Sequence, residues 1–391
     1  MTVSDYQGFT FKLTTDMRFG IGISRNIGDL LTDSNWGRLC LVVDSAIINS
    51  NETVHDLIEN LRRSSEVVRV FENKMAEPDY DYLDNCKKEL ANLKFDSIVA
   101  IGCGSTLDLA KGIAVLMTNP GSAITYKGFN LVKNPALPVI AIPTTAGTGS
   151  EVTPTAVFID KKEKRKLGIN TELVRPRLAI LDPALTLTCP KGVTVSSGMD
   201  ALLHALESFI SKKATPVSRI FSQEAFSLIF NNLTKIIDDM SNMEQRAKLL
   251  LGSYYAGIAL MNSGAATAHA LSYPLGVHFN VPHGLAGAVF LPQVTKMNVE
   301  MGCLSYAPLF DLIDGSEKTL SEVEKNKGFL KVVNKLCQRL AIPTSLKPFG
   351  ASARDIDALL EDSLLWRKEA IEQNPVSFNR KEIREIWESL V

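Results

Sequence analysis

Short β-branched apolar runs alternate with helical patterns in the first half of the chain. The four clearest runs are residues 38–44, 65–72, 95–102 and 137–143. Such alternation is typical of βαβ units, whose parallel strands are covered by helices on both faces. Two shorter runs, residues 156–160 and 178–183, could extend that sheet or form a hairpin beside it. The first half is therefore predicted to be an α/β domain built on a parallel sheet.

The pattern changes after Thr186, where apolar residues recur at the spacing of one helix face. Residues 221–240 and 330–340 show this spacing, and residues 249–260 are apolar nearly all round, which predicts a buried helix. Near the end, the pair Asn379 and Glu382 has the spacing of a capping box that starts a final helix. We therefore expect an α/β domain over residues 1–186 and an all-helical domain over residues 187–391.

Composition and charge narrow the functional classes. The 391 residues suit two domains, and 42 basic against 43 acidic residues give a net charge of −1. No basic field for nucleic acid is expected from this balance. Apolar stretches are interrupted well before they reach the ~20 residues of a membrane helix. Residues 1–13 also lack the features of a secretory signal. The expected location is therefore the cytoplasm. Six cysteines without CxxC spacing predict buried thiols and no cysteine metal site.

A glycine-rich turn follows the apolar run 95–102. It carries Gly102, Gly104 and Ser105 and leads into a helical pattern. Glycines at such a turn let the backbone approach a ligand, and the first N–H groups of the helix favour an anion such as a pyrophosphate. The turn has neither the full GxGxxG spacing nor the GK[ST] of a P-loop. We interpret it as a nucleotide-binding turn, with a purely structural turn as the alternative.

A second polar turn follows the run 137–143. Its candidate binding residues are Thr144, Thr145, Thr148 and Ser150. Their hydroxyl and backbone groups can donate hydrogen bonds to a phosphate or a ribose. Because both turns follow strands of one predicted parallel sheet, they are expected at its carboxyl edge, where open α/β folds bind ligands.

Asp44 ends the run 38–44. An acidic residue at such a strand end can accept hydrogen bonds from the ribose hydroxyls of NAD, and it repels the 2′-phosphate of NADP. The alternative is an aspartate that only stabilises a turn or caps a helix.

Histidines and one aspartate form a candidate metal site in the second half. Asp200 and His204 lie four residues apart in a helical pattern and therefore share one face. His269, His278 and His283 fall within fifteen residues of one another. One carboxylate and three imidazoles suit Fe(II) or Zn(II) and leave room for a water or a substrate oxygen. The candidate ligands are Asp200, His204, His269 and His283. The alternative is that each histidine has a separate structural role and binds no metal.

At this point the sequence resembles the iron-containing, metal-dependent alcohol dehydrogenase family. The resemblance covers nearly the whole chain and rests on motifs in the same order. They are FGIG near residue 20, VVD ending at residue 44, and the segments 102–111, 143–151, 178–183, 198–207 and 269–284. It implies a Rossmann-like NAD-binding domain followed by a helical domain, as in the dehydroquinate synthase-like architecture, with the active site in the cleft between them.

The resemblance also implies roles for individual residues. The four candidate ligands match the family's metal ligands, and the two turns match its cofactor loops, which adds Asp108 to the cofactor residues. Lys166 lies where the family usually has a lysine near the cofactor, and Asp44 matches the acidic residue associated with NAD over NADP. The middle glycine of the family's first turn is replaced here by Cys103.

The proton relay is where this sequence departs from several family members. Tyr273 stands where some members have a histidine thought to help proton transfer. A phenol with a pKa near 10 is a poor shuttle at neutral pH, so Tyr273 is a candidate for either catalysis or packing. His278 is the candidate replacement relay, with a polar lining role as its alternative. The fifth histidine, His55, is expected at the surface.

The expected function is hydride transfer between a small primary or secondary alcohol and NAD, with the aldehyde or ketone as the substrate of the reverse reaction. A lyase or synthase of the dehydroquinate synthase type, which uses NAD and a metal transiently, is the alternative enzyme class. A non-catalytic nucleotide-binding protein is a third possibility. The resemblance further implies that the protein forms a homodimer. It does not specify the substrate.

Overall fold

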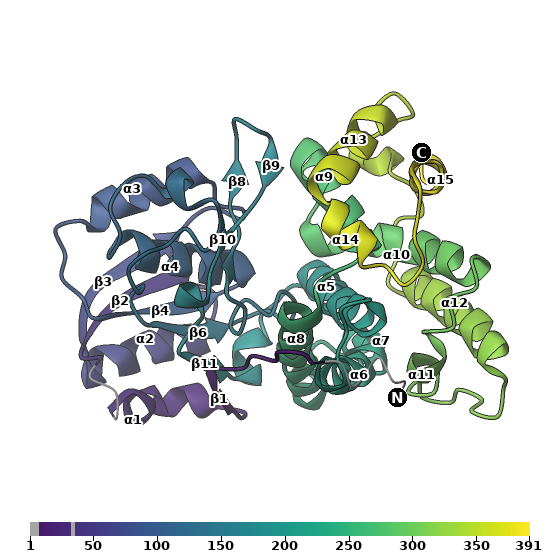
Figure 1. Ribbon diagram of the computed structural model, residues 1–391. Helices are drawn as coiled ribbons and strands as arrows, with labels where there is room; N and C mark the ends of the chain where they lie inside the picture. Colours follow the sequence, from purple (N-terminus) through teal and green to yellow (C-terminus); the bar gives the residue numbers. More distant parts are fainter. Residues whose placement is uncertain (1–7, 33–35) are drawn as a thin grey trace. The chain divides into compact units, whose positions relative to one another are not determined.

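The computed structural model describes residues 8–32 and 36–391 (Figure 1). The described chain divides into two compact units, residues 13–190 and residues 8–12 together with Lys191–Val391. The sequence placed the boundary at Thr186, and the structure places it at Pro190, immediately before a long helix. The first unit contains a parallel sheet with helices and the second is helical, which confirms the expected fold class.

A six-stranded sheet forms the centre of the first unit, in the order β1-β11-β6-β4-β2-β3. Its strands are β1 (Asp16–Phe19), β2 (Arg38–Asp44), β3 (Glu66–Asn73), β4 (Ser97–Gly102), β6 (Val139–Pro143) and β11 (Leu178–Leu181). Every pairing between neighbours in this sheet is parallel. Gly102 is paired with Pro143, so the two polar turns begin side by side at the same edge.

The strands alternate their side chains between two hydrophobic cores, as a sheet buried on both faces requires. On one face, Val42 and Ala100 pack with α3 (Tyr80–Leu90) and α4 (Gly104–Leu116). On the other face, Leu41 and Ile101 pack with α1 (Ile27–Thr32) and α2 (Glu52–Ser64). Figure 1 shows this three-layer arrangement within the unit.

The two shorter runs take different places. Residues 178–183 supply β11, which extends the main sheet as one of the two expected alternatives. Residues 156–160 do not form one strand, because the backbone N–H of Val157 donates to Asp108 Oδ2 at 2.9 Å instead. The run is divided between two small sheets. These sheets comprise β5 (Gly128–Phe129), β10 (Ile169–Asn170) and β7 (Thr155–Ala156), and the hairpin of β8 (Ile159–Asp160) and β9 (Arg165–Lys166).

The second unit is built from helices. They are α5 (Lys191–Ile210), α6 (Pro216–Phe230), α7 (Leu233–Asp238), α8 (Met243–Ser263), α9 (Thr267–Phe279), α10 (His283–Glu300), α11 (Ala307–Phe310), α12 (Glu322–Arg339), α13 (Ile356–Trp366), α14 (Lys368–Glu372) and α15 (Arg380–Glu388). The expected buried helix is the middle of α8, and the capping box at Asn379 and Glu382 is present at the start of α15. No helix in the described part of the chain has both the length and the apolar character needed to cross a membrane.

The helical spacing over residues 221–240 is divided between two helices. The helix ends at Phe230 and α7 begins at Leu233. Two asparagines at the break donate to carbonyl groups: Asn231 to Leu312 O at 2.9 Å and Asn232 to Leu228 O at 2.7 Å. Side chains that bond the backbone in this way favour helix ends over helix interiors. Both helices pack against α5 and α8, so apolar residues are needed on each side of the break.

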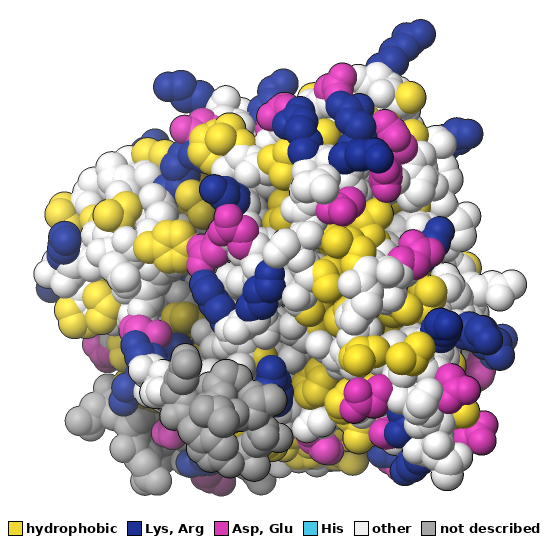
Figure 2. Space-filling view, turned by 45° about the vertical axis from the view of Figure 1, so that its right-hand side comes forward, with side chains coloured by type: hydrophobic (Ala, Val, Ile, Leu, Met, Phe, Trp, Pro, Cys, Tyr) yellow, Lys and Arg dark blue, Asp and Glu magenta, His cyan; other side chains and the backbone are white. Residues whose placement is uncertain are grey.

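Acidic and basic side chains are interspersed on the face shown in Figure 2, with apolar side chains between them. This mixture agrees with the nearly balanced charge of the sequence.

Candidate metal centre and cofactor-binding loops

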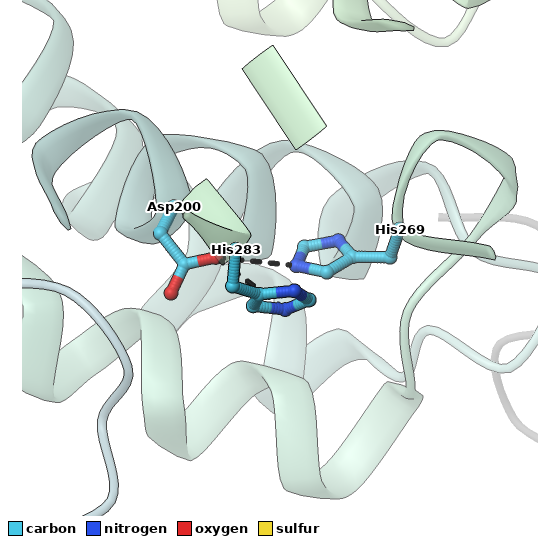
Figure 3. Close-up of side chains that lie close together, drawn as sticks. All are labelled: Asp200, His269 and His283. Atoms are coloured by element: carbon cyan, nitrogen blue, oxygen red, sulfur yellow. Dashed lines mark ion pairs between the residues drawn. The ribbon is translucent and has the colours of Figure 1, made fainter. Parts of the chain in front are cut away.

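Three helices of the second unit bring the candidate metal ligands together. Asp200 and His204 lie one turn apart on α5, His269 lies in the first turn of α9, and His283 begins α10. The Nε2 atoms of His204, His269 and His283 lie 3.9, 3.7 and 3.8 Å from the same oxygen, Asp200 Oδ1. Figure 3 shows the rings of His269 and His283 directed at the Asp200 carboxylate.

These distances suit a cation between the side chains better than direct hydrogen bonds. They exceed ordinary hydrogen-bond lengths. Two ligand atoms bound at about 2.1 Å to a tetrahedral centre are about 3.4 Å apart, which is close to the observed separations. The ligand atoms of Asp200, His269 and His283 all lie within 4.8 Å of one another, while His204 approaches Asp200 with its ring stacked on that of His269. The residues present therefore fit Fe(II) or Zn(II).

One buried nitrogen supports this fit independently. His269 is buried, and its Nε2 has no hydrogen-bond partner among residues 8–32 and 36–391. A buried polar atom without a partner is costly unless something else satisfies it. A divalent cation at this position would use the Nε2 lone pair and remove the cost.

The electrostatics of the group favour a cation as well. Burial alone would raise the pKa of the Asp200 carboxyl, but His204, His269 and His283 around it lower that pKa well below its usual value. Burial would lower the pKa of His269, but Asp200 and Glu207 raise it to about 10. The site thus holds positive charge strongly, as a metal site with two nearby carboxylates should.

The close approach of α10 to α5 depends on Gly284. A Cβ atom at this position would lie 2.0 Å from Ser196 O and 2.9 Å from Asp200 Cβ. No side chain fits there, so glycine allows the start of α10, and with it His283, to lie against Asp200. The glycine of the PHG segment is therefore required for packing beside the candidate site.

Sequence reasoning missed Glu207, which lies behind His269. This buried carboxylate accepts a hydrogen bond from His269 Nδ1 at 2.8 Å and from the backbone N–H groups of Ala266 and Ala268. A signal was present, because Asp200, His204 and Glu207 follow the i, i+4, i+7 spacing of one helix face.

The two candidate proton-relay residues have different surroundings. The ring of Tyr273 lies 4.9 Å from the ring of His283, and the guanidinium of Arg367 lies 3.4 Å from the centre of the tyrosine ring. His278 instead bonds Asp362 of α13, with 2.6 Å between Nε2 and Oδ2. The structure thus places Tyr273 beside the candidate ligands and joins His278 to α13. His55 is exposed on α2, as expected.

The two glycine-rich turns of the first unit contact each other. A Cβ atom on Gly104 would lie 2.4 Å from the side chain of Thr148, so glycine is needed where the turns meet. Thr144 N donates to Gly102 O at 3.0 Å, which joins their first residues. Thr148 is exposed, and Ser105 and Thr145 are half-buried, so all three can reach a ligand.

Asp44 lies next to the first turn. Its Oδ1 accepts from Ala46 N at 3.0 Å, and its Oδ2 is 3.4 Å from Cys103 Sγ. The residue that replaces the family's middle glycine is therefore a hydrogen-bond donor to the residue expected to select the cofactor.

A buried lysine of α4, also missed from the sequence, anchors the second turn. Lys111 Nζ donates to Ser150 Oγ at 2.7 Å and to Thr155 O at 2.8 Å, and it lies 3.4 Å from Asp108 Oδ1. Ser150 Oγ in turn donates to Asp108 at 2.5 Å. Burial lowers the pKa of Lys111, and the Asp108 charge opposes this effect. Asp108 and Ser150 are therefore engaged within the protein.

Lys166 is also engaged. It is buried at the base of the β8–β9 hairpin, and its Nζ lies 2.6 Å from Glu77 Oε1.

Family models match both halves of the chain. Residues 14–183 match the family model described as iron-containing alcohol dehydrogenase, and residues 194–391 match its C-terminal counterpart. The chain is 33% identical over 352 residues to long-chain-alcohol dehydrogenase 1 of Geobacillus thermodenitrificans, covering 89% of this chain and 88% of the relative. It is 31% identical over 348 residues to the NAD-dependent methanol dehydrogenase of Bacillus methanolicus, covering 88% and 90%.

Solved structures show the same fold. A crystal structure of 1,3-propanediol oxidoreductase superposes with a TM-score of 0.92 at 29% identity, covering 98% of this chain and all of the other. A sulfoacetaldehyde reductase from Bifidobacterium kashiwanohense in complex with NAD+ gives a TM-score of 0.85 at 27% identity, covering 98% and 99%. With both halves matched, the chain belongs to the iron-containing alcohol dehydrogenase family.

Proposed function

We propose that this protein is a metal-dependent alcohol dehydrogenase that transfers hydride between a small primary or secondary alcohol and NAD, and reduces the aldehyde or ketone in reverse. The observation that carries the proposal is the convergence of three imidazole nitrogens on Asp200 Oδ1. Relatives described as alcohol dehydrogenases, one of them as NAD-dependent, support it. Family membership does not favour the alternative lyase or synthase.

Asp200, His204, His269 and His283 would hold the cation. Bound there, Fe(II) or Zn(II) would polarise the substrate oxygen and lower the pKa of the alcohol. Asp200 supplies a negative charge that partly neutralises the ion, and His283, whose side chain is 26% exposed, forms the accessible side of the group.

The two turns would hold the nucleotide. Backbone N–H groups near Gly102 and Gly104 and the hydroxyls of Ser105, Thr145 and Thr148 would donate to the pyrophosphate. Thr144 is buried at the start of its turn and would act by fixing the backbone. The cofactor roles of Asp108, Ser150 and Lys166 are proposed to be indirect, because their side chains hold the surrounding loops.

Asp44 is proposed to select NAD. Replacing it with alanine should lower the NADH to NADPH ratio of kcat/KM at least about tenfold, since a like charge facing a 2′-phosphate costs several kcal/mol. Asp29, on α1, provides a control because it is an acidic residue of the same unit outside both turns. Initial rates with both cofactors measure the ratio. An unchanged ratio in Asp44→Ala would show that another residue selects the cofactor.

The proton relay is proposed to involve Tyr273 or His278, and their surroundings predict unequal effects. Tyr273→Phe removes the hydroxyl of a ring that packs against the ring of His283, whereas His278→Gln acts on a ring bonded to Asp362. We expect the larger loss of kcat in Tyr273→Phe, about 10²-fold, as is typical when a general acid or base is removed. In His278→Gln we expect kcat to fall by less than about tenfold. The pH profiles of kcat measure this, and the reverse order would assign the relay to His278.

The decisive functional test is a panel of aldehydes and ketones assayed with NADH and NADPH after loading with Fe(II), Zn(II) or chelator. Metal-dependent oxidation of one NADH per substrate supports the proposal. Product formed without net NADH change would instead support a lyase or synthase. The cytoplasmic location and the homodimeric state stay predictions.

A further inference from the structure

The buried carboxylate of Glu207 has no role among the expected metal ligands. It lies on α5, and its Oε2 is 2.8 Å from His269 Nδ1 and 2.6 Å from Ala266 N. Its Oε1 accepts from Ala268 N at 2.7 Å. Glu207 is 1% exposed, so no bulk water competes for these bonds.

These contacts determine which nitrogen of His269 carries hydrogen. An ionised carboxylate can only accept, so His269 Nδ1 must be the donor to Glu207. When a cation replaces the hydrogen on Nε2, the lone pair of that nitrogen faces the cation on the side of Asp200 Oδ1, which lies 3.7 Å away. The hydrogen bond also sets the plane of the ring.

We propose that Glu207 is a positioning residue that fixes the tautomer and orientation of His269 and thereby sets the metal affinity of the site. This inference rests on the proposed metal site. Glu207 does not touch the substrate in this account; it acts through His269.

A purely structural role for Glu207 makes different predictions. Ala266 at the start of α9 makes no side-chain capping bond, and Glu207 satisfies backbone N–H groups of that first turn from another helix. Loss of this capping would lower stability without altering the affinity of a folded site. Metal affinity and folding stability must therefore be measured separately.

Glu207→Gln is the informative substitution. The amide has only one acceptor oxygen, so its NH₂ group can lie in two places. In the first arrangement it faces His269 Nδ1 and Ala266 N, and in the second it faces Ala268 N. In the first arrangement the NH₂ favours hydrogen on Nε2, which blocks coordination. In the second the neutral amide oxygen accepts from Nδ1 more weakly than the carboxylate does. Both arrangements also set the NH₂ against one backbone N–H group, which lowers stability.

The experiment measures the Kd of metal-free protein for Zn(II) by competition with a chelator, and records the visible spectrum of the Co(II) form. We expect Glu207→Gln to bind Zn(II) 10- to 100-fold more weakly, with an altered Co(II) spectrum. Asn379→Ala, which removes the cap of α15 in the same unit, is the matched control: it should lower the Tm without changing the Kd. Equal Kd values and spectra for wild type and Glu207→Gln would overturn the proposal.

A second measurement does not require the variant to fold. Nitrogen-15 NMR of histidine-labelled, Zn(II)-loaded wild-type protein should show His269 protonated at Nδ1 and coordinated at Nε2. Coordination at Nδ1, or hydrogen on Nε2, would overturn the proposal. Failure of wild-type protein to bind Zn(II) through these residues would contradict the metal site itself, and so the proposed function, rather than the role of Glu207.

Discussion

Replacing His283 with alanine is expected to lower kcat by about 10³-fold or more, because the polarising cation supplies several kcal/mol of transition-state stabilisation. The side chain of His283 is partly exposed at the start of α10, so its truncation should leave the fold intact. NADH binding should also persist, since the proposed cofactor turns belong to residues 13–190.

His55→Ala provides the matched control, because His55 is an exposed histidine on α2. It should retain wild-type kcat and metal content. Steady-state rates, metal analysis and fluorescence titration with NADH measure the three properties. Near wild-type turnover in metal-loaded His283→Ala protein would show that the ligand assignment is wrong.

Replacing Lys111 with methionine is expected to destabilise the first unit by about 3 kcal/mol, the lower end of the cost of removing one partner from a buried ion pair. Methionine keeps most of the volume but cannot donate to Ser150 or Thr155. Asp108 would lose its nearest cation, and the loop that carries Thr148 would lose its anchor.

Urea unfolding of the NAD-free protein measures this loss. Lys88→Met is the control, because Lys88 is an exposed lysine on α3 and its replacement should change stability little. The same unfolding free energy for both variants would show that the Lys111 network does not stabilise the fold. Weaker NADH binding should accompany the destabilisation.

The central strands of the main sheet were predictable because they are buried on both faces. The runs at residues 38–44 and 95–102 correspond to β2 and β4 and are apolar at almost every position. In contrast, β1 (Asp16–Phe19) is a four-residue edge strand with little burial, so it lacks the continuous apolar run of a buried strand. Residues 156–160 supply a hairpin strand only at their end, Ile159–Asp160, because Val157 bonds a side chain in place of a neighbouring strand.

The candidate site was predictable where its residues share a local pattern. Asp200 and His204 are one helical turn apart, and His269 and His283 lie close together in the sequence. Glu207 continued the same helix face and was detectable in principle. The positions of Arg367 over Tyr273 and of Asp362 beside His278 depend on how α13 packs against α9, and no local spacing encodes that packing.

Anomalous diffraction from crystals of anaerobically prepared, metal-loaded protein tests the central claim most directly. Data on both sides of the iron and zinc absorption edges identify the ion and its position. We predict a single peak within about 2.0–2.3 Å of an Asp200 oxygen and of the Nε2 atoms of His204, His269 and His283. An active crystal preparation whose peak lies away from these four side chains would contradict the account.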